Sequence, residues 1–218
     1  MQKFISIKKW LNEQESISSP TYGCIMMDAK IPKWEELHIA GIDQKDLYVE
    51  PGEDYGLETE PHVTVLYGIH EDEIDPEVIM SVIEKNMETV VVTITNISIF
   101  ENDKYDVVKY DVPVTEELQK YRDMFMKAFP NTQTFPDYHP HITLAYVKPG
   151  EGSKYVKELN EPFEVVFDKG VYSFHTTNDE GETELVRKQF VFPKEDDFEV
   201  DLTSDGSEII SPFKSDNK

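Results

Sequence analysis

Two short segments of the chain share one pattern, a histidine followed two residues later by a threonine. The first reads HVTVLY from His62, and the second reads HITLAY from His141. β-Branched and aromatic residues dominate both segments, which predicts strands. Side chains alternate faces along a strand, so each histidine should share a face with its threonine, Thr64 or Thr143. The residues between them should pack into a core.

These residue types suit proton transfer on a phosphodiester. Cleavage takes a proton from the nucleophile, either water or a ribose 2′-hydroxyl, and gives one to the leaving oxygen. One neutral and one protonated imidazole can do both near neutral pH, because histidine titrates there. Threonine hydroxyls can donate hydrogen bonds to the non-bridging oxygens and stabilise the developing charge. The chemistry needs no metal in principle.

One such strand carries little information, because the solvent face of a half-buried strand can hold a histidine and a threonine by chance. Here the two copies lie about 80 residues apart, each in a strand–helix–strand setting. That order is expected of a duplication. The repetition favours one site built from both copies.

The two motifs resemble those of the 2H phosphoesterases, a superfamily named for two H-Φ-[ST]-Φ motifs. Its members include RNA 2′,3′-cyclic phosphodiesterases, 2′,5′-oligoadenylate phosphodiesterases and phage anti-CBASS enzymes that cleave cyclic oligonucleotide signals. The resemblance spans roughly residues 20–192. It implies an α+β, bilobal fold: two pseudo-symmetric β-sheet lobes with outer helices and a central cleft. By analogy His141 is the general base and His62 the general acid.

Within that superfamily we expect a phosphodiesterase that hydrolyses small cyclic or short oligonucleotides, of the anti-CBASS type that acts on 3′,5′-linked cyclic di- or trinucleotides. The alternatives are a 2′,3′-cyclic phosphodiesterase on RNA ends, a 2′,5′-oligoadenylate phosphodiesterase, and a protein that sequesters a nucleotide without cutting it. A cyclic oligonucleotide needs pockets for two or more bases, whereas a 2′,3′-cyclic end needs one. The sequence does not give the number of pockets.

Four further residues are candidates for substrate binding. Tyr22 lies on a strand expected to neighbour a motif strand and could stack on a base, as could Phe135 and Tyr138 in the loop before the second motif. Lys148 follows the second motif and could meet a phosphate.

The motif tyrosines, Tyr67 and Tyr146, each come five residues after a histidine. Strict alternation places them on the opposite face from the histidines, so we expect them to pack in the core unless the strands bulge.

A metal site is the competing hypothesis. His139 and His141 have His-x-His spacing, and the acidic residues 71–73 could supply oxygen ligands. Pro140 separates the two histidines, and the chain shows no other pattern of metal-ligand spacing. We therefore expect no metal and no other cofactor.

The charge balance limits the partners. The 218 residues contain 21 Lys and Arg against 44 Asp and Glu, a formal net charge of −23. Such a surface repels a long polyanion, because nucleic-acid affinity comes largely from phosphate neutralisation. We expect a small nucleotide substrate, no long nucleic acid and a monomer.

The chain shows no stretch of roughly 20 apolar residues and no signal peptide, so we expect no membrane contact. Cys24 is its single cysteine. These features favour a cytoplasmic protein, in the host cytoplasm if the protein is viral.

Hydrophobic periodicity and turn residues predict the elements. Strands are expected at 22–28, 62–68, 90–99, 105–112, 141–147, 163–168, 171–175 and 183–192, and helices at 34–38, 76–87, 115–129 and 153–159. We divide the chain into an N-terminal amphipathic extension (1–18), a phosphoesterase-like domain of two lobes (19–193) and an acidic mobile tail (194–218).

Overall fold

The computed structural model describes residues 22–133, 137–177, 182–192, 198–202 and 208–212. The predicted N-terminal extension (1–18) lies outside the described residues, and so does Phe135. The helices of the described part are η1 (Trp34–Ile39), η2 (Gln44–Asp46), η3 (Glu71–Glu73), α2 (Pro76–Asn86), α3 (Glu116–Ala128) and η4 (Gly152–Tyr155). The strands are β1 (Tyr22–Asp28), β2 (His62–His70), β3 (Val90–Phe100), β4 (Asp106–Asp111), β5 (His141–Val147), β6 (Lys157–Phe167), β7 (Lys169–Thr177), β8 (Thr183–Val191), β9 (Phe198–Leu202) and β10 (Glu208–Pro212).

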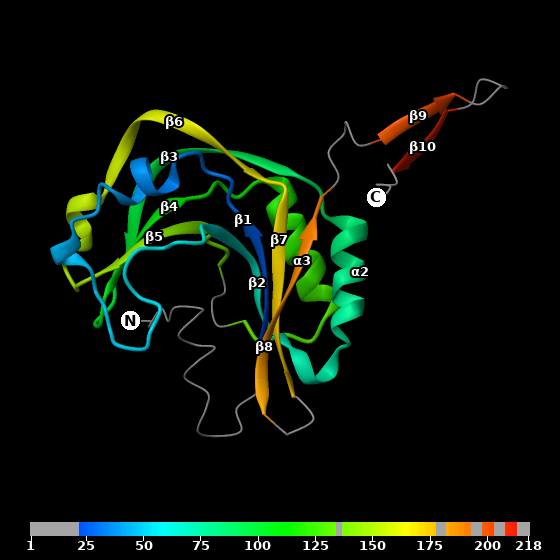
Figure 1. Ribbon diagram of the computed structural model, residues 1–218, viewed down its shortest axis with the longest axis horizontal. Helices are drawn as coiled ribbons and strands as arrows, with labels where there is room; N and C mark the ends of the chain where they lie inside the picture. The colour runs from blue at the N-terminus through cyan, green and yellow to red at the C-terminus, as the bar shows by residue number, and fades with distance from the viewer. Residues whose placement is uncertain (1–21, 134–136, 178–181, 193–197, 203–207, 213–218) are drawn as a thin grey trace, which may run out of the picture.

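Eight strands form one antiparallel sheet in the order β6-β3-β4-β5-β2-β1-β7-β8. The two motif strands, β2 and β5, are its central neighbours. Four strands lie in each half, β6, β3, β4 and β5 in one and β2, β1, β7 and β8 in the other. Figure 1 shows the sheet curving, with α2 and α3 outside the curve beside the half that contains β2. The fold is thus mixed α/β around a large antiparallel sheet.

The two halves meet where β2 pairs with β5. Val63 lies opposite Ile142, and both side chains are fully buried. β3 and β4 pair as an antiparallel hairpin, and β4 pairs in turn with β5. The position of each motif strand is therefore fixed by neighbours on both sides.

Both long helices begin and end close to their predicted bounds. Asp75 caps α2 by accepting a hydrogen bond from the backbone N–H of Glu77 at 2.9 Å, and Pro76 occupies the first helical position. The side chain of Thr115 caps α3 by accepting from the backbone N–H of Leu118 at 3.2 Å. In the part of the chain that the structure describes, neither these helices nor any other has the length and apolarity of a membrane span.

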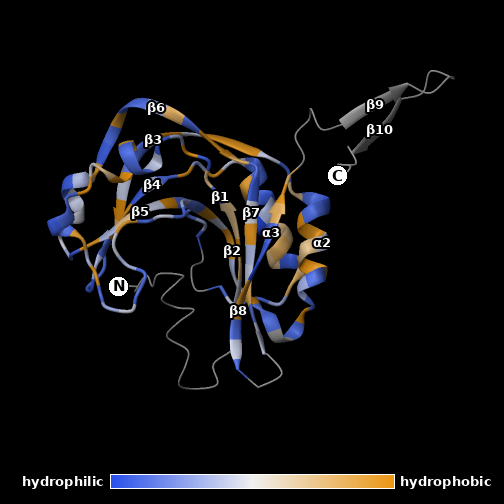
Figure 2. Ribbon diagram, in the orientation of Figure 1, coloured by the Kyte–Doolittle hydropathy of each residue, from blue (hydrophilic) through white to orange (hydrophobic). Residues whose placement is uncertain are grey.

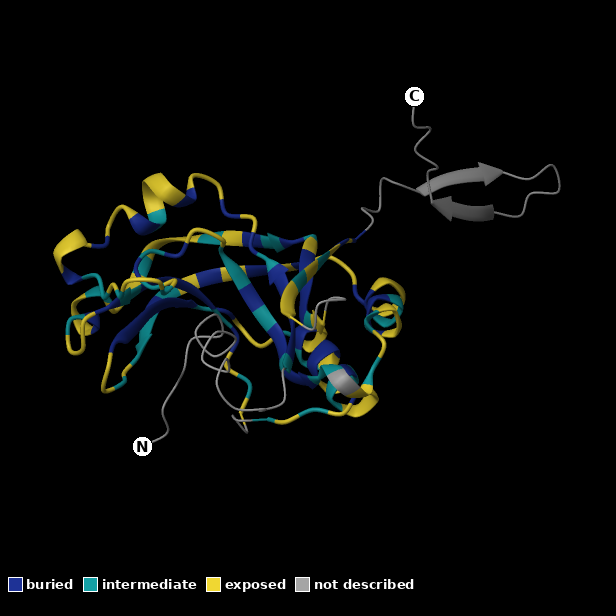
Figure 3. Cartoon of the chain, turned by 60° about the horizontal axis from the view of Figure 1, so that its bottom comes forward, coloured by how far each residue is buried: buried dark blue, intermediate teal, exposed yellow. Residues whose placement is uncertain are grey.

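One large core fills the space between the sheet and the helices. It joins Ile79 and Ile83 of α2, Leu118 and Phe125 of α3, and the inward residues of the strands. Figure 2 shows apolar residues concentrated in the strands and alternating with polar ones along the helices. Figure 3 shows the matching distribution of buried residues. A second, smaller cluster of Cys24, Met26 and Val171, with Tyr67 packed against it, is separate from this core.

Two segments differ from the prediction. The helix expected at 153–159 is only the short η4, and β6 already begins at Lys157. Pairing with β3 decides this, because β6 runs beside it from Val90–Phe167 to Ile97–Lys157. Pro162 is tolerated inside β6 because this is an edge strand. Within residues 194–218, β9 and β10 pair as a two-stranded antiparallel sheet that the sequence analysis did not include, and the remaining residues are outside the described part.

The structure leaves no space for a side chain at Gly68. Its φ is +97°, and a Cβ would lie 2.2 Å from the carbonyl oxygen of Thr132. Gly68→Ala should therefore lower the free energy of unfolding by about 2–4 kcal/mol, since strained backbone and steric overlap add. Gly150→Ala is the matched control, because its φ is +81° but no atom lies within 4 Å. Urea denaturation measures both, and equal losses would contradict the steric argument.

Candidate active site

The fold brings both histidine–threonine pairs together. Val63 and Ile142 are paired across the antiparallel strands β2 and β5. Antiparallel geometry then sets His62 next to Thr143 and Thr64 next to His141. Val63 and Ile142 point into the large core, so the four polar side chains share the other face of the sheet. Both histidines and Thr64 are half-buried, and Thr143 is buried. Each histidine therefore faces the threonine of the other motif.

The backbone fixes the tautomer of each histidine in the same way. Nδ1 of His62 lies 2.8 Å from the carbonyl oxygen of Glu60, and Nδ1 of His141 lies 2.9 Å from that of His139. A carbonyl only accepts, so Nδ1 carries the proton in both rings. In the neutral ring, Nε2 is then the unprotonated nitrogen and the one that can accept a proton.

The charge state of His141 is set by its surroundings. Burial lowers the pKa of His141 to about 4, and the charges of Lys109 and His62 act in the same direction. His141 is therefore neutral across the physiological range and suits the role of proton acceptor. The assignment of His141 as the general base, which the superfamily resemblance implied, stays a prediction.

The motif tyrosines lie on the face opposite to the one that strict alternation predicts. Along β2 the pairing with β1 shifts register between Ile25–Leu66 and Met26–Thr64, so Val65 has no partner on β1. Along β5 the pairing with β4 shifts between Val108–Ala145 and Lys109–Thr143, so Leu144 is the extra residue. Both motif strands thus bulge at the third residue after the histidine.

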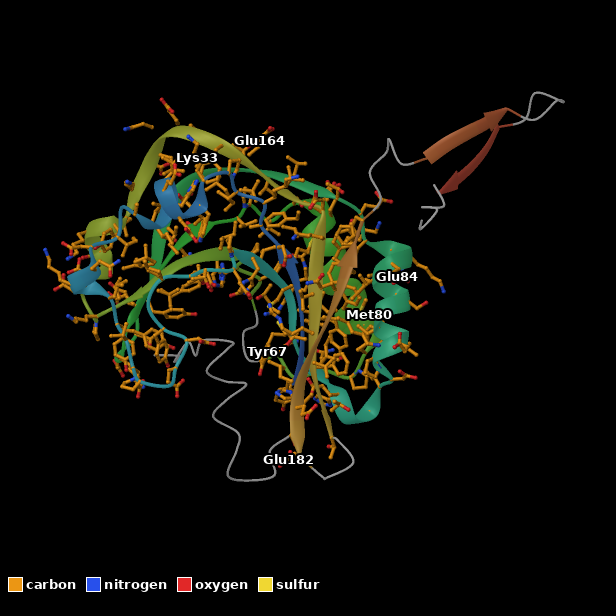
Figure 4. The ribbon with its side chains drawn as sticks, in the orientation of Figure 1. Lys33, Tyr67, Met80, Glu84, Glu164 and Glu182 are labelled. Carbon is orange, nitrogen blue, oxygen red and sulfur yellow. The ribbon has the colours of Figure 1, made fainter. Side chains whose placement is uncertain are left out.

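Each bulge returns the following tyrosine to the site face. Tyr67 packs against Cys24 and Met26, which belong to the smaller cluster. Figure 4 shows Tyr67 on the side of the sheet away from Met80 of α2. Tyr146 lies opposite Val107, on the same face as the Lys109–Thr143 pair. The expected core packing of the two tyrosines is therefore wrong, and the bulges are the reason.

An aromatic group adjoins the site at each end. The ring of Tyr67 contacts Tyr22, with centroids 6.2 Å apart, and Tyr22 lies 5.6 Å from His70. The ring of Tyr146 contacts Tyr55 and Tyr105, each at 5.3 Å. Because β2 and β5 are antiparallel, these two groups, the Tyr67 group and the Tyr146 group, extend in opposite directions from the histidines.

Cys24 supports the first threonine. The thiol is fully buried on β1 and shares a hydrogen bond with the side chain of Thr64. Burial raises the pKa of Cys24 to about 12, so the thiol stays protonated and does not act as a nucleophile. Its contact with Thr64 orients that hydroxyl.

The other predicted binding residues have different surroundings. Tyr138 packs against the large core, and its hydroxyl donates to the Thr64 carbonyl at 3.1 Å. The guanidinium of Arg122 lies 5.0 Å from the Tyr138 ring centre. Lys148 is exposed and donates to the carbonyl of Lys45 at 2.6 Å. Their contact with substrate remains a prediction, and only Tyr22 lies in an aromatic group beside the site.

Sequence analysis missed a charged network next to His141. Lys109 lies opposite Thr143 and Asp111 opposite His141 on β4. The Lys109 ammonium donates to Asp111 and, at 2.6 Å, to Ser98 Oγ. A lysine at the centre of the apolar run that forms β4 was the available signal, because a buried lysine requires a partner.

The alternative hypothesis was a metal site at His139 and His141. His139 is exposed, and its backbone carbonyl holds His141. Across the residues that the structure describes, no three His, Cys, Asp or Glu side chains are grouped as metal ligands would be.

A large antiparallel sheet that presents two histidine–threonine pairs from adjacent central strands defines the 2H phosphoesterase class. The family model of the 2′-5′ RNA ligase superfamily matches residues 34–170. That range is more than half of the chain, which therefore belongs to this superfamily.

A solved structure shares this fold. The crystal structure of E. coli LigT complexed with 3′-AMP has a TM-score of 0.50 and 14% identity, covering 81% of this chain and 100% of LigT. The apo form of E. coli LigT has a TM-score of 0.48, 14% identity and the same coverages. A structure described as a phosphoesterase has a TM-score of 0.46 and 15% identity, covering 80% of this chain and 100% of its own. No curated protein sequence gives a significant match.

Lowering the pH should protonate His141 only in strongly acidic solution. The pKa of about 4 predicts a ring that stays neutral at pH 5.5 and carries its proton on Nδ1. Nitrogen NMR chemical shifts of the imidazole, followed from pH 7 to pH 3.5 and assigned with His141→Gln, measure both properties. A midpoint near the ordinary value of about 6.5 would show that the site does not exclude water from this ring.

Proposed function

We propose that the protein is a metal-independent phosphodiesterase that cleaves small cyclic or short oligonucleotides by two-histidine acid–base catalysis. The observation that carries the proposal is the pairing of Val63 with Ile142 on adjacent antiparallel strands, which sets His62 next to Thr143 and Thr64 next to His141. Two proton-transfer groups and two hydroxyl donors then surround one position on the sheet. A phosphate group placed there meets all four.

The proposed proton transfers start from the neutral state of His141. His141 is neutral and accepts through Nε2 the proton of the attacking hydroxyl, from water or a ribose 2′-OH. The nucleophilic oxygen bonds to phosphorus while the bond from phosphorus to the leaving oxygen breaks. His62 donates its Nε2 proton to that oxygen. The hydroxyls of Thr64 and Thr143 donate to the non-bridging oxygens, whose negative charge they stabilise.

The two aromatic groups support a substrate with a base on each side of the scissile phosphate. Aromatic side chains bind bases by stacking, which contributes roughly 1–3 kcal/mol per base. The Tyr67 group and the Tyr146 group lie beyond opposite ends of the catalytic residues. A 2′,3′-cyclic end would use one group only, whereas a linear or cyclic oligonucleotide would use both.

Charge and similarity agree with a small substrate. The net charge of −23 disfavours long nucleic acids, and E. coli LigT, which shares the fold, has been crystallised with 3′-AMP. We propose 3′,5′-linked cyclic di- or trinucleotides of the anti-CBASS type as the substrates. The arrangement of the sheet supports this proposal, because its two halves meet at the motif strands and each half supplies one histidine–threonine pair and one aromatic group.

Replacing either histidine by alanine should lower turnover by several orders of magnitude, because each substitution removes a proton-transfer group. Thr64→Ala and Thr143→Ala should each cost about 2–4 kcal/mol of transition-state stabilisation. The measurement is mass spectrometry of products after incubation with EDTA and cyclic dinucleotides, cyclic trinucleotides, a 2′,5′-oligoadenylate or a 2′,3′-cyclic mononucleotide. The His62→Ala/His141→Ala variant is the control.

Each outcome of this experiment has a distinct meaning. Cleavage that survives EDTA and is absent in the double variant supports the proposal and identifies the substrate class. Activity lost to EDTA would instead favour a metal reaction. Tight binding of one nucleotide without cleavage would indicate a sequestering protein.

Loss of one aromatic group should weaken binding more than chemistry. Tyr67→Ala and Tyr146→Ala are each expected to raise KM for a cyclic dinucleotide by roughly 5- to 100-fold, the equivalent of one stacked base. Only one of them should affect a 2′,3′-cyclic mononucleotide. Steady-state kinetics on both substrates tests this, with Tyr48→Ala as a control at the edge of the Tyr146 group, 5.0 Å from Tyr55. Equal sensitivity of both substrates to both substitutions would contradict two separate base sites.

A further inference from the structure

The two histidine–threonine pairs have corresponding neighbours on the next strand. On β1, Asp28 lies opposite His62 and Met26 opposite Thr64. On β4, Asp111 lies opposite His141. The aspartates correspond, but the residue opposite Thr143 is Lys109 where the other half has a methionine. The sheet therefore places a cation beside one pair and an apolar side chain beside the other.

Lys109 is a buried cation. Its side chain is 6% exposed, and its ammonium donates to Asp111 and to Ser98 Oγ. Asp111 also accepts from Asn96 at 2.5 Å and from Ser98 at 2.6 Å. These bonds hold the ammonium in one place. Because they occupy the ammonium, we do not assign it as a direct phosphate ligand.

One aromatic ring connects this cation to the catalytic base. The Lys109 ammonium lies 4.2 Å from the centre of the Phe100 ring. The same ring contacts His141 edge to face, with centroids 4.9 Å apart. The Phe100 ring therefore contacts both the Lys109 ammonium and the His141 imidazole. Water screens the charge of the buried ammonium poorly.

The strand beside the first pair, β1, contains no lysine or arginine. Asp28 has a lysine partner, Lys169, at 3.5 Å, but the Lys169 side chain is 56% exposed. Water screens an exposed charge, so its influence on His62 is small. The difference between the two halves is the burial of the cation.

We propose that Lys109 is a positioning residue that makes the two histidine–threonine pairs inequivalent and so fixes His141 as the general base and His62 as the general acid. The inference rests on the proposed phosphodiesterase function. Lys109 acts through His141, because a fixed positive charge disfavours protonation of a neighbouring imidazole.

The charged groups around His141 act on its pKa in both directions. Lys109 and Asp111 face it from β4, and His62 faces it from β2. Lys109 and His62 lower the pKa of His141 and Asp111 raises it, in addition to the lowering by burial. Removal of Lys109 should raise that pKa, so His141 would become protonated at higher pH.

The test is Lys109→Met, which gives the second pair the same neighbour as the first. Imidazole NMR should show the titration midpoint of His141 rising by roughly one pH unit, the effect of one nearby charge. The acidic limb of the pH profile of kcat/KM for a cyclic dinucleotide should move upward by the same amount. Lys109→Arg retains the charge and should keep both midpoints near those of the unaltered protein.

Two controls separate charge from structure. Lys127→Met removes an exposed lysine of α3 and should leave the midpoint unchanged. Lys109→Met/Asp111→Asn removes both members of the ion pair, so it leaves no unpaired carboxylate and is the variant to use if the single one does not fold. Its midpoint should lie between those of the unaltered protein and Lys109→Met.

The NMR titration needs no turnover, so it tests the effect of Lys109 on His141 even if none of the nucleotides is cleaved. An unchanged midpoint in Lys109→Met would overturn the proposal, as would a double variant whose midpoint returns to that of the unaltered protein. A shifted midpoint with an unshifted kcat/KM profile would show that His141 is not the base. The proposed function fails separately, if the unaltered protein cleaves nothing.

Discussion

The pairing of β2 with β5 is the contact on which the site depends. Val63 and Ile142 lie opposite each other and are fully buried, so the core holds the two strands in register. A shift of one residue would turn every side chain of a strand to its other face and bury the histidines. The core therefore fixes the positions of the two histidine–threonine pairs by packing on the opposite face of the sheet. The four polar side chains need no direct contact with one another to be aligned.

The paired bulges determine what else reaches the site. A regular strand would place histidine, threonine and tyrosine on alternate faces, and the tyrosines would join the core. One extra residue in each motif strand, Val65 or Leu144, brings Tyr67 and Tyr146 to the catalytic face. Each strand then carries a proton-transfer group, a hydroxyl donor and an aromatic ring along one side. Two strands can therefore supply both the residues for the proposed chemistry and the rings for the proposed base binding.

Burial makes the two similar pairs chemically different. Both histidines donate Nδ1–H to a backbone carbonyl two residues earlier, so their tautomers are the same. The surroundings of His141 contain the ion pair Lys109–Asp111, in which the lysine side chain is 6% exposed and the aspartate side chain 40%. Burying the ammonium costs free energy, and its hydrogen bonds to Asp111 and Ser98 offset that cost. In the proposal above, the function of this pair is its effect on the neighbouring imidazole.

The sequence by itself determined most of the strands, both long helices and the four motif residues, because these depend on local alternation and residue chemistry. Only the tertiary structure decided which strands are neighbours, that η4 is short because β6 pairs with β3, and that the strands bulge. It also decided that Lys109 lies beside His141, and that Cys24 supports Thr64. Those features depend on pairing between residues far apart in the chain, and hydrophobic pattern carries no information about register or bulges. The neutral state of His141 also depends on the tertiary structure, since the desolvation that lowers its pKa is a property of the packed site.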